Sequence, residues 1–278
     1  MKMEKIITWL QASSIQFYSD QNDKIMKRLT GTGGWILEHT SYTQWKNKPT
    51  SQVLWVKGKR GCGKSILASV VVQEIKTFCE RPQNLKCPNN EKTAFAYIYC
   101  NSLDANTIDP SKFLSSIIEQ LCYQLVNSAT DNYLEYIYDR HGGNRSIDMA
   151  EIREALDSLL GRFNESFIVV DGLDELRGLS HDQFEGLCRF FRKLTGPRSD
   201  GAVVKLVAFS RPEYAAISNE FDGCPSITID SGANEKDIEK FITMRLSSTL
   251  LHLKQNPEPL KDIGRDLLSR AEGMFLWG

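Results

Sequence analysis

Long hydrophobic runs are missing from this sequence, and their absence excludes membrane-spanning proteins. No stretch reaches the roughly 18 consecutive apolar residues that a transmembrane helix needs. The early apolar stretch at residues 6–10 is also too short for the core of a secretory signal peptide. We therefore expect a cytoplasmic protein without a membrane partner.

An excess of charge of one sign is missing as well. The 34 lysines and arginines nearly balance the 35 aspartates and glutamates, which gives a net charge of -1. Binding to nucleic acid or to an anionic surface is driven by an excess of basic side chains. The composition therefore gives no reason to expect a nucleic-acid partner.

Closely spaced cysteines and histidines are missing too. The seven cysteines are odd in number and include no C-x-x-C pair, and the four histidines lie far apart. These spacings support neither a disulfide framework nor a zinc site. We expect most of the cysteines to be reduced and buried.

The sequence does contain short apolar runs, which are separated by longer segments of helical periodicity. Nearly continuous apolar runs are typical of strands in a parallel sheet that is covered on both faces. We expect an α/β fold: a five-stranded, mainly parallel sheet with the first strand in its interior and helices on both faces. The expected strands lie at residues 53–56, 94–99, 167–170, 203–209 and 226–229.

The strand pattern stops after the fifth strand, and two helical segments follow. Asn234 resembles the start of a helix, and a second helix is expected after Pro259. Because an apolar run at residues 273–278 begins another element, we expect the chain to be part of a longer protein. The expected organisation is a lead-in helix over 1–24, an α/β domain over 25–230 that carries the motifs described next, and a small helical subdomain over 231–278.

A glycine-rich segment, GKRGCGKS, follows the first strand directly, fits the pattern G-x-x-x-x-G-K-[ST] and leads into a helical run. In such a P-loop, backbone N–H groups and a helix N-terminus surround phosphate oxygens. Lys64 reaches the β- and γ-phosphates of a nucleoside triphosphate, and the Ser65 hydroxyl binds Mg²⁺. The alternative is a glycine-rich turn before a helix. The residues expected to bind the nucleotide here are Gly58, Lys59, Arg60, Gly61, Cys62, Gly63, Lys64, Ser65 and Ile66.

The strand at residues 167–170 ends in acidic residues, DGLDE, as a Walker B element does. Asp171 would hold Mg²⁺ at the carboxyl end of this strand. In many ATPases a glutamate follows this aspartate directly, but Gly172 stands here and the acids come at Asp174 and Glu175. One of these two acids would polarise the attacking water, and their displacement predicts slow hydrolysis. The alternative is a solvated turn after a strand.

A cation ends the next strand, in the segment AFSRPE. Parallel strands all open at their carboxyl ends toward the ligand, so Arg211 would contact the γ-phosphate. The alternative is an ordinary surface arginine. The candidate catalytic residues are therefore Asp174, Glu175 and Arg211.

Together, GKRGCGKS, FIVVDGLDEL and AFSRPE closely resemble the NACHT family of signal-transduction NTPases. The displaced acidic pair in DGLDE is the most specific of the three motifs. The segments TGTGGWIL at residues 30–37 and AEGMFLW at residues 271–277 are similar to the fungal branch of NOD-like receptors and incompatibility NTPases. The resemblance covers roughly residues 25–277.

This resemblance implies a switch that alternates between a closed, ADP-like state and an open, oligomerising state. It implies self-association of the full-length protein and a signalling role of the innate-immune type, with effector and sensor domains outside this sequence. Animal members of the family tend to carry a proline near Gly273, where this chain has Met274 and Phe275.

The segment at residues 29–35 precedes the first strand. In P-loop switches of this kind the entering chain passes beside the base and ribose, so Thr30, Gly31 and Thr32 are candidates for adenine recognition. Glycine allows close approach of the backbone. The alternative is a flexible connector with a buried tryptophan. The expected cofactors are ATP or ADP with Mg²⁺, and GTP or GDP is the alternative.

Three functions are compatible with these motifs. The first is a regulatory NTPase that hydrolyses ATP slowly and controls assembly. The second is a nucleotide-dependent scaffold that never turns over. The third is a P-loop kinase for a small metabolite, although the sequence shows no obvious acceptor site. Guanine-specific GTPases usually carry N-K-x-D after the Walker elements, and the similar string NKPT lacks the aspartate and precedes the P-loop.

Overall fold

The computed structural model of the chain describes residues 2–11, 18–80, 93–101, 109–125, 132–142, 147–230, 232–249 and 258–275. Its centre is a sheet in the order β2-β3-β4-β1-β5, and every neighbouring pair of these strands is parallel. The strands are β1 (Gln52–Gly58), β2 (Thr93–Tyr99), β3 (Glu165–Asp171), β4 (Val203–Ser210) and β5 (Ser226–Ile229). The five expected strands and the interior position of the first are therefore confirmed.

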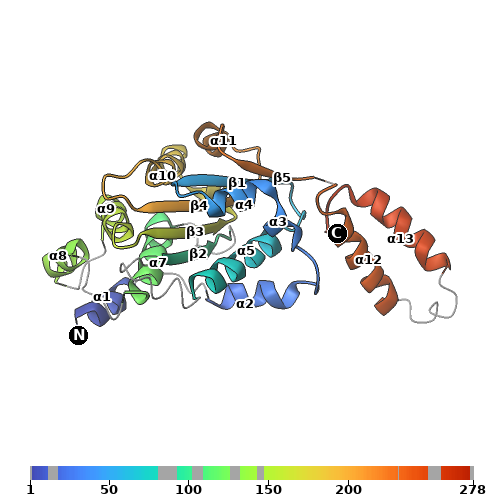
Figure 1. Cartoon of the computed structure of the whole chain (residues 1–278), viewed down its shortest axis with the longest axis horizontal. Helices are drawn as coiled ribbons and strands as arrows, with labels where there is room; N and C mark the ends of the chain where they lie inside the picture. The colour runs from blue at the N-terminus through green and yellow to red at the C-terminus, as the bar shows by residue number, and fades with distance from the viewer. Residues whose placement is uncertain are drawn as a thin grey trace.

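Helices cover both faces of the sheet because successive side chains of a strand point to opposite sides. In β1, Leu54 packs in the cluster that contains α5 (Lys64–Cys79), whereas Val53 packs in the cluster that contains α7 (Pro110–Tyr123). Figure 1 shows the strands at the centre of this part of the molecule with helices around them. The other helices around the sheet are α1 (Lys2–Gln11), α2 (Tyr18–Lys27), α3 (Trp35–Glu38), α4 (Thr40–Asn47), α8 (Asn132–His141), α9 (Met149–Leu160), α10 (His181–Leu194), α11 (Ala215–Phe221) and the 3-10 helix η1 (Leu173–Gly178).

The segment before β1 differs from the single lead-in helix expected over residues 1–24. The structure has two helices there, and α2 continues to Lys27, past the expected boundary. α1 buries Ile6 against the α7 layer, and α2 packs on α5. The sequence of α2, YSDQNDKIMK, holds few apolar residues, so hydrophobic periodicity gives little sign of this helix.

A buried glutamine fixes α2 in place. The Nε2 atom of Gln21 donates to the carbonyl of Ser69 on α5 at 3.1 Å, and its Oε1 accepts from the hydroxyl of Tyr99 at the end of β2. Gln21 is 7% exposed. A buried amide with both ends satisfied specifies one orientation of the helix.

Among the described residues after β5 there are two helices, α12 (Glu235–Thr249) and α13 (Glu258–Ala271). They pack against each other, and Figure 1 shows them at one end of the molecule. Their starts agree with the helices expected near Asn234 and Pro259. The division into a domain over 25–230 and a subdomain over 231–278 stays a prediction, and the last residues of AEGMFLW lie outside the described residues.

Two further properties follow from composition. Five of the six cysteines that the structure describes are buried, and all six are free thiols, as expected: Cys62, Cys79, Cys100, Cys122, Cys188 and the half-buried Cys224. Within the described ranges, no helix combines the length and the apolar character that crossing a bilayer requires.

Candidate functional site

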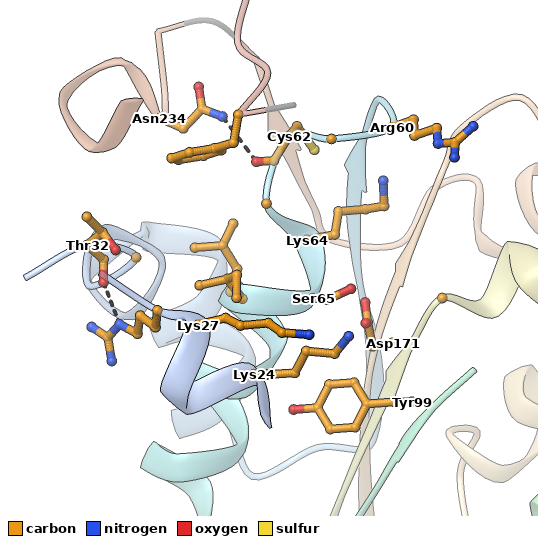
Figure 2. A pocket seen from close by; sticks show the side chains of 18 of the residues that line it. Lys24, Lys27, Thr32, Arg60, Cys62, Lys64, Ser65, Tyr99, Asp171 and Asn234 are labelled. Carbon is orange, nitrogen blue, oxygen red and sulfur yellow. Dashed lines mark hydrogen bonds between the residues drawn. The ribbon is translucent and has the colours of Figure 1, made fainter. Parts of the chain in front are cut away.

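A cavity of about 830 Å³ lies where β1 and β3 end, between the P-loop, α2 and the α12–α13 segment. Figure 2 shows it from close by. Its volume is in the range of sites for small molecules and cofactors. The sequence-predicted residues on its wall are Thr32, Arg60, Gly61, Cys62, Gly63, Lys64, Ser65, Ile66, Asp171, Asp174, Glu175 and Arg211.

Glycine is required at three positions of the P-loop. Gly61 and Gly63 have φ values of 77° and 93°, which side chains rarely adopt. At Gly58 the constraint is space, because a Cβ there would lie 2.5 Å from the Sγ atom of Cys62. The loop thus carries the chain from β1 directly into the N-terminus of α5, whose first N–H groups have no partner within the helix.

The Lys64 side chain is held by the loop itself. Its Nζ atom donates to the carbonyls of Gly58 at 2.7 Å and Lys59 at 2.8 Å. Gly58 and Lys59 do not belong to the cavity wall. Both carbonyls position the lysine in this structure, and contact of Gly58 and Lys59 with the nucleotide stays a prediction.

Asp171 ends β3 and is 3% exposed. Burial raises its pKa to about 6, while a hydrogen bond from Ser65 and the charges of Lys24 and Lys64 lower it. Within the described residues its Oδ1 atom has no hydrogen-bond partner. A buried carboxylate oxygen beside a serine hydroxyl suits Mg²⁺, which prefers oxygen ligands. These residues therefore fit the expected metal.

Gly172 explains why the acidic pair is displaced. Its φ is 72°, and a Cβ at this position would lie 2.9 Å from the carbonyl oxygen of Cys100. A glutamate directly after Asp171 would therefore be strained. The chain turns at this glycine and places Asp174 and Glu175 in the first turn of η1.

Arg211 is held by both of these acids. Its backbone N–H donates to Oδ1 of Asp174 at 3.1 Å, and its Nη2 donates to Oε1 of Glu175 at 2.9 Å. Its Nε lies 2.9 Å from Oδ2 of Asp174, as an ion pair without hydrogen-bond geometry. Burial raises the pKa of Asp174, and Arg211 opposes that rise. Arg211 thus positions the acids, and its contact with a γ-phosphate stays a prediction.

Of the three residues expected to read the base, Thr32 lines the cavity, and Thr30 and Gly31 do not. The N–H and the hydroxyl of Thr32 both donate to the Leu29 carbonyl, and its own carbonyl accepts from Nε of Arg28. The backbone of Thr32 is therefore engaged inside its own segment.

The sequence reasoning missed a wall that comes from the far end of the chain. Asn234 is 2% exposed, and its Nδ2 donates to the carbonyls of Cys62 at 3.1 Å and Gly273 at 2.9 Å. Two carbonyl acceptors fix which end of the amide carries the nitrogen. An asparagine before a helix looks like an ordinary cap in the sequence, so nothing there indicated this second contact.

Phe275 completes this wall. Its N–H donates to the Gly61 carbonyl at 2.8 Å, and its ring lies beside Gly63, 3.2 Å from where a Cβ would stand. The ring also makes an edge contact with Phe241 of α12, with centroids 5.7 Å apart. We define Asn234 and Phe275 as the latch, because together they join the P-loop to the chain after β5.

The helix α2 also contributes to the site. Lys24 and Lys27 lie on the cavity wall, and Figure 2 shows both side chains directed toward Ser65 and Asp171. Neither lysine was predicted, because the helix that carries them was not predicted in this form.

Comparisons with known proteins relate the chain to one protein family. The family model described as Nephrocystin 3, N-terminal matches residues 31–211, a range that includes the P-loop, Asp171 and Arg211. The vegetative incompatibility protein HET-E-1 of Podospora anserina is 20% identical over 254 residues. That match covers 87% of this chain but 17% of the relative, so the chain spans less than a fifth of that protein.

Among solved structures, a DNA replication initiation factor is similar with a TM-score of 0.40 and 11% identity, over 87% of this chain and 63% of that one. Domain III of the Thermotoga maritima replication initiation protein DnaA has a TM-score of 0.40 and 13% identity, over 89% and 80%. These TM-scores are too low to support a fold on their own. The sheet topology and the family match establish the P-loop NTPase fold.

Proposed function

Since the chain belongs to the Nephrocystin 3, N-terminal family and is a NACHT-type P-loop NTPase, we propose that it binds a nucleoside triphosphate with Mg²⁺ and hydrolyses it slowly. The observation that carries this proposal is the cavity, whose wall brings together Lys64, Ser65, Asp171 and Glu175 from two separate segments of the chain.

Each of these residues has one role in the proposal. The P-loop N–H groups and Lys64 bind the phosphates, and Ser65 and Asp171 would hold the metal ion. Bound Mg²⁺ would neutralise charge that develops on the phosphate oxygens. Glu175, which Arg211 orients, accepts a proton from the attacking water.

The proposed role in the cell is that of a switch. The nucleotide state controls self-association of the full-length protein in the cytoplasm, and the effector and sensor domains lie outside this sequence. The likeness to a vegetative incompatibility protein supports a fungal signalling role of the innate-immune type. Gel filtration of the full-length protein with ADP and with a non-hydrolysable ATP analogue tests this role, and one unchanged oligomeric state would exclude it.

We propose ATP and ADP as the nucleotides, with GTP and GDP as the alternative. Trp35, near Thr32, lines the cavity, and its buried Nε1 atom has no hydrogen-bond partner within the described residues. Such a donor needs an acceptor from the base or ribose. If groups of this segment read the base, adenine nucleotides should compete at least about tenfold better than guanine nucleotides. Equal affinities in a competition titration would remove the adenine assignment.

A non-hydrolysing scaffold is the second candidate function, and the geometry of the two acids supports it. Gly172 displaces the acidic pair, and Arg211 binds both members of it. Steady-state phosphate release that disappears in Glu175→Gln would establish hydrolysis. Glu213→Gln is the matched control, because Glu213 is exposed two residues beyond Arg211. Absence of release from the unaltered protein would favour the scaffold.

The most direct test identifies the nucleotide that purified protein releases on denaturation. We expect an adenine nucleotide, separated by chromatography and identified by mass. A protein that releases none, and that binds neither ATP nor GTP in calorimetry with Mg²⁺, would refute the proposed function.

A further inference from the structure

Three of the six cations on the cavity wall are already bound to acceptors of the protein. Arg211 is held by two carboxylates, Lys64 by two carbonyls of the P-loop, and Arg28 by the Thr32 carbonyl. These contacts occupy Lys64 and Arg211, the two residues that the sequence assigns to the β- and γ-phosphates.

Lys24 is placed differently. Its Nζ lies 5.9 Å from the centroid of the Tyr99 ring, and its charge acts on Asp171. Across the described ranges, no carboxylate or carbonyl is recorded as a partner of this ammonium group. The side chain is half-buried, whereas the neighbouring Lys27 is exposed at the rim. Lys24 therefore brings a positive charge to the cavity wall without a hydrogen bond or ion pair to a described carboxylate or carbonyl.

The position of Lys24 is fixed by the helix that carries it. Gln21, one turn earlier on α2, is bound to the Ser69 carbonyl, one turn after Ser65 on α5. This contact aligns the two helices so that Lys24 lies beside Ser65. Figure 2 shows the Lys24 ammonium next to Ser65 and Asp171, on the side of the cavity away from Thr32.

We infer that Lys24 binds the terminal phosphate of the nucleotide, so that α2 senses whether a triphosphate or a diphosphate is bound. This inference rests on the proposed nucleotide site. Ser65 and Asp171 would hold the metal ion that neutralises the terminal phosphates, so a cation beside these two residues would meet the γ end of the triphosphate. A lysine binds phosphate as a point charge, and ADP lacks the group that would meet it.

The competing explanation is that Lys24 only offsets the buried charge of Asp171. The two roles differ in their effect on nucleotides. Loss of an Asp171 partner would weaken Mg-ADP and Mg-ATP alike, because both need the same metal ligands. Loss of a γ-phosphate ligand would weaken the triphosphate alone.

Calorimetry on the whole 278-residue chain with Mg²⁺ separates these roles, using ADP and a non-hydrolysable ATP analogue. In Lys24→Met we expect the affinity for the ATP analogue to fall about tenfold and the affinity for ADP to change less than about twofold. Lys24→Arg should keep most of the difference in affinity between the ATP analogue and ADP. The matched control is Lys76→Met, which removes an exposed lysine of α5 and should change neither affinity.

Hydrogen exchange of the unaltered protein gives a second measurement that does not depend on how well a variant folds. Amides of α2 should be more protected with the ATP analogue than with ADP, and Lys24→Met should abolish that difference. Equal protection in both nucleotide states, or equal affinity losses for both nucleotides, would overturn the inference. If the unaltered protein binds neither nucleotide, the proposed function fails; if it binds both and Lys24→Met keeps the full affinity for the ATP analogue, only the role of Lys24 fails.

Discussion

At the scale of single residues, one acid of the site destabilises the folded protein when it is charged. Asp171 is almost fully buried, and burial raises its pKa from 3.8 to about 6. A carboxyl group with a raised pKa in the folded chain binds its proton more tightly there than in the unfolded chain. Its contribution to stability is therefore present at acid pH and is lost as the pH rises through about 6.

Asp171→Asn should consequently stabilise the nucleotide-free protein above neutral pH. At pH 8 with EDTA we expect the free energy of unfolding in urea to rise by about 1–3 kcal/mol, with a smaller gain at pH 4. The same variant should lose Mg²⁺-dependent nucleotide binding. Asp23→Asn, an exposed change on α2, should do neither. If Asp171→Asn instead lowers the free energy of unfolding at pH 8, the buried charge of Asp171 does not destabilise the folded protein.

Lys64→Ala should remove triphosphate binding and leave the fold intact. The substitution deletes the charge that compensates the phosphates, and the carbonyls that it releases lie next to the exposed backbone of the loop. Calorimetry with Mg²⁺ and ATP measures the loss, and circular dichroism checks the fold. Wild-type affinity in this variant would show that the P-loop is not the site.

Arg211→Ala should weaken ATP binding more than ADP binding and should also reduce phosphate release. The first effect follows from the expected contact with the γ-phosphate. The second follows from the two acids, which lose the group that holds them. Titration of both nucleotides tests the first effect, and equal losses for the two would reject a contact with the γ-phosphate.

At the scale of elements, the sheet and the P-loop were predictable because their signals are local. Buried strands such as β3 read as continuous apolar runs, and the P-loop is a single segment between a strand and a helix. The helix α2 gave no such signal, because a buried glutamine rather than an apolar stripe docks it. The latch could not be predicted because Asn234 meets Cys62 across 172 positions of sequence.

Loss of the hydrogen bonds that hold α2 should lower the free energy of unfolding. Gln21→Ala would leave the Ser69 carbonyl and the Tyr99 hydroxyl without this partner, so we expect a loss of about 1–3 kcal/mol in the free energy of unfolding. Asn22→Ala is the control, since Asn22 is exposed on the same helix. If the two variants unfold at the same urea concentration, the glutamine does not hold α2.

At the scale of the whole molecule, the P-loop takes part in two sets of contacts, those proposed with the phosphates and those with the latch. In the proposed function its N–H groups bind the phosphates, whereas the carbonyls of Gly61 and Cys62 accept hydrogen bonds from the latch. Phosphate binding and latch contacts therefore use different atoms of the same loop. Both can be present together, and a shift of the loop changes both.

Asn234→Ala should loosen this connection. Two buried carbonyls lose their donor, so amides at residues 271–275 should exchange faster, and nucleotide affinity should fall several-fold. Hydrogen exchange and calorimetry measure the two effects. Thr243→Ala, an exposed change on α12, should cause neither. Faster exchange with unchanged affinity would separate the latch from the nucleotide site.

The latch and the bound nucleotide must also affect each other. If docking of the chain after β5 raises nucleotide affinity by some factor, bound nucleotide must favour that docking by the same factor, because the coupling free energy is a property of the pair. A partner that pulls α12 and α13 away from Gly61 and Cys62 would therefore act as a nucleotide-release factor without touching the cavity.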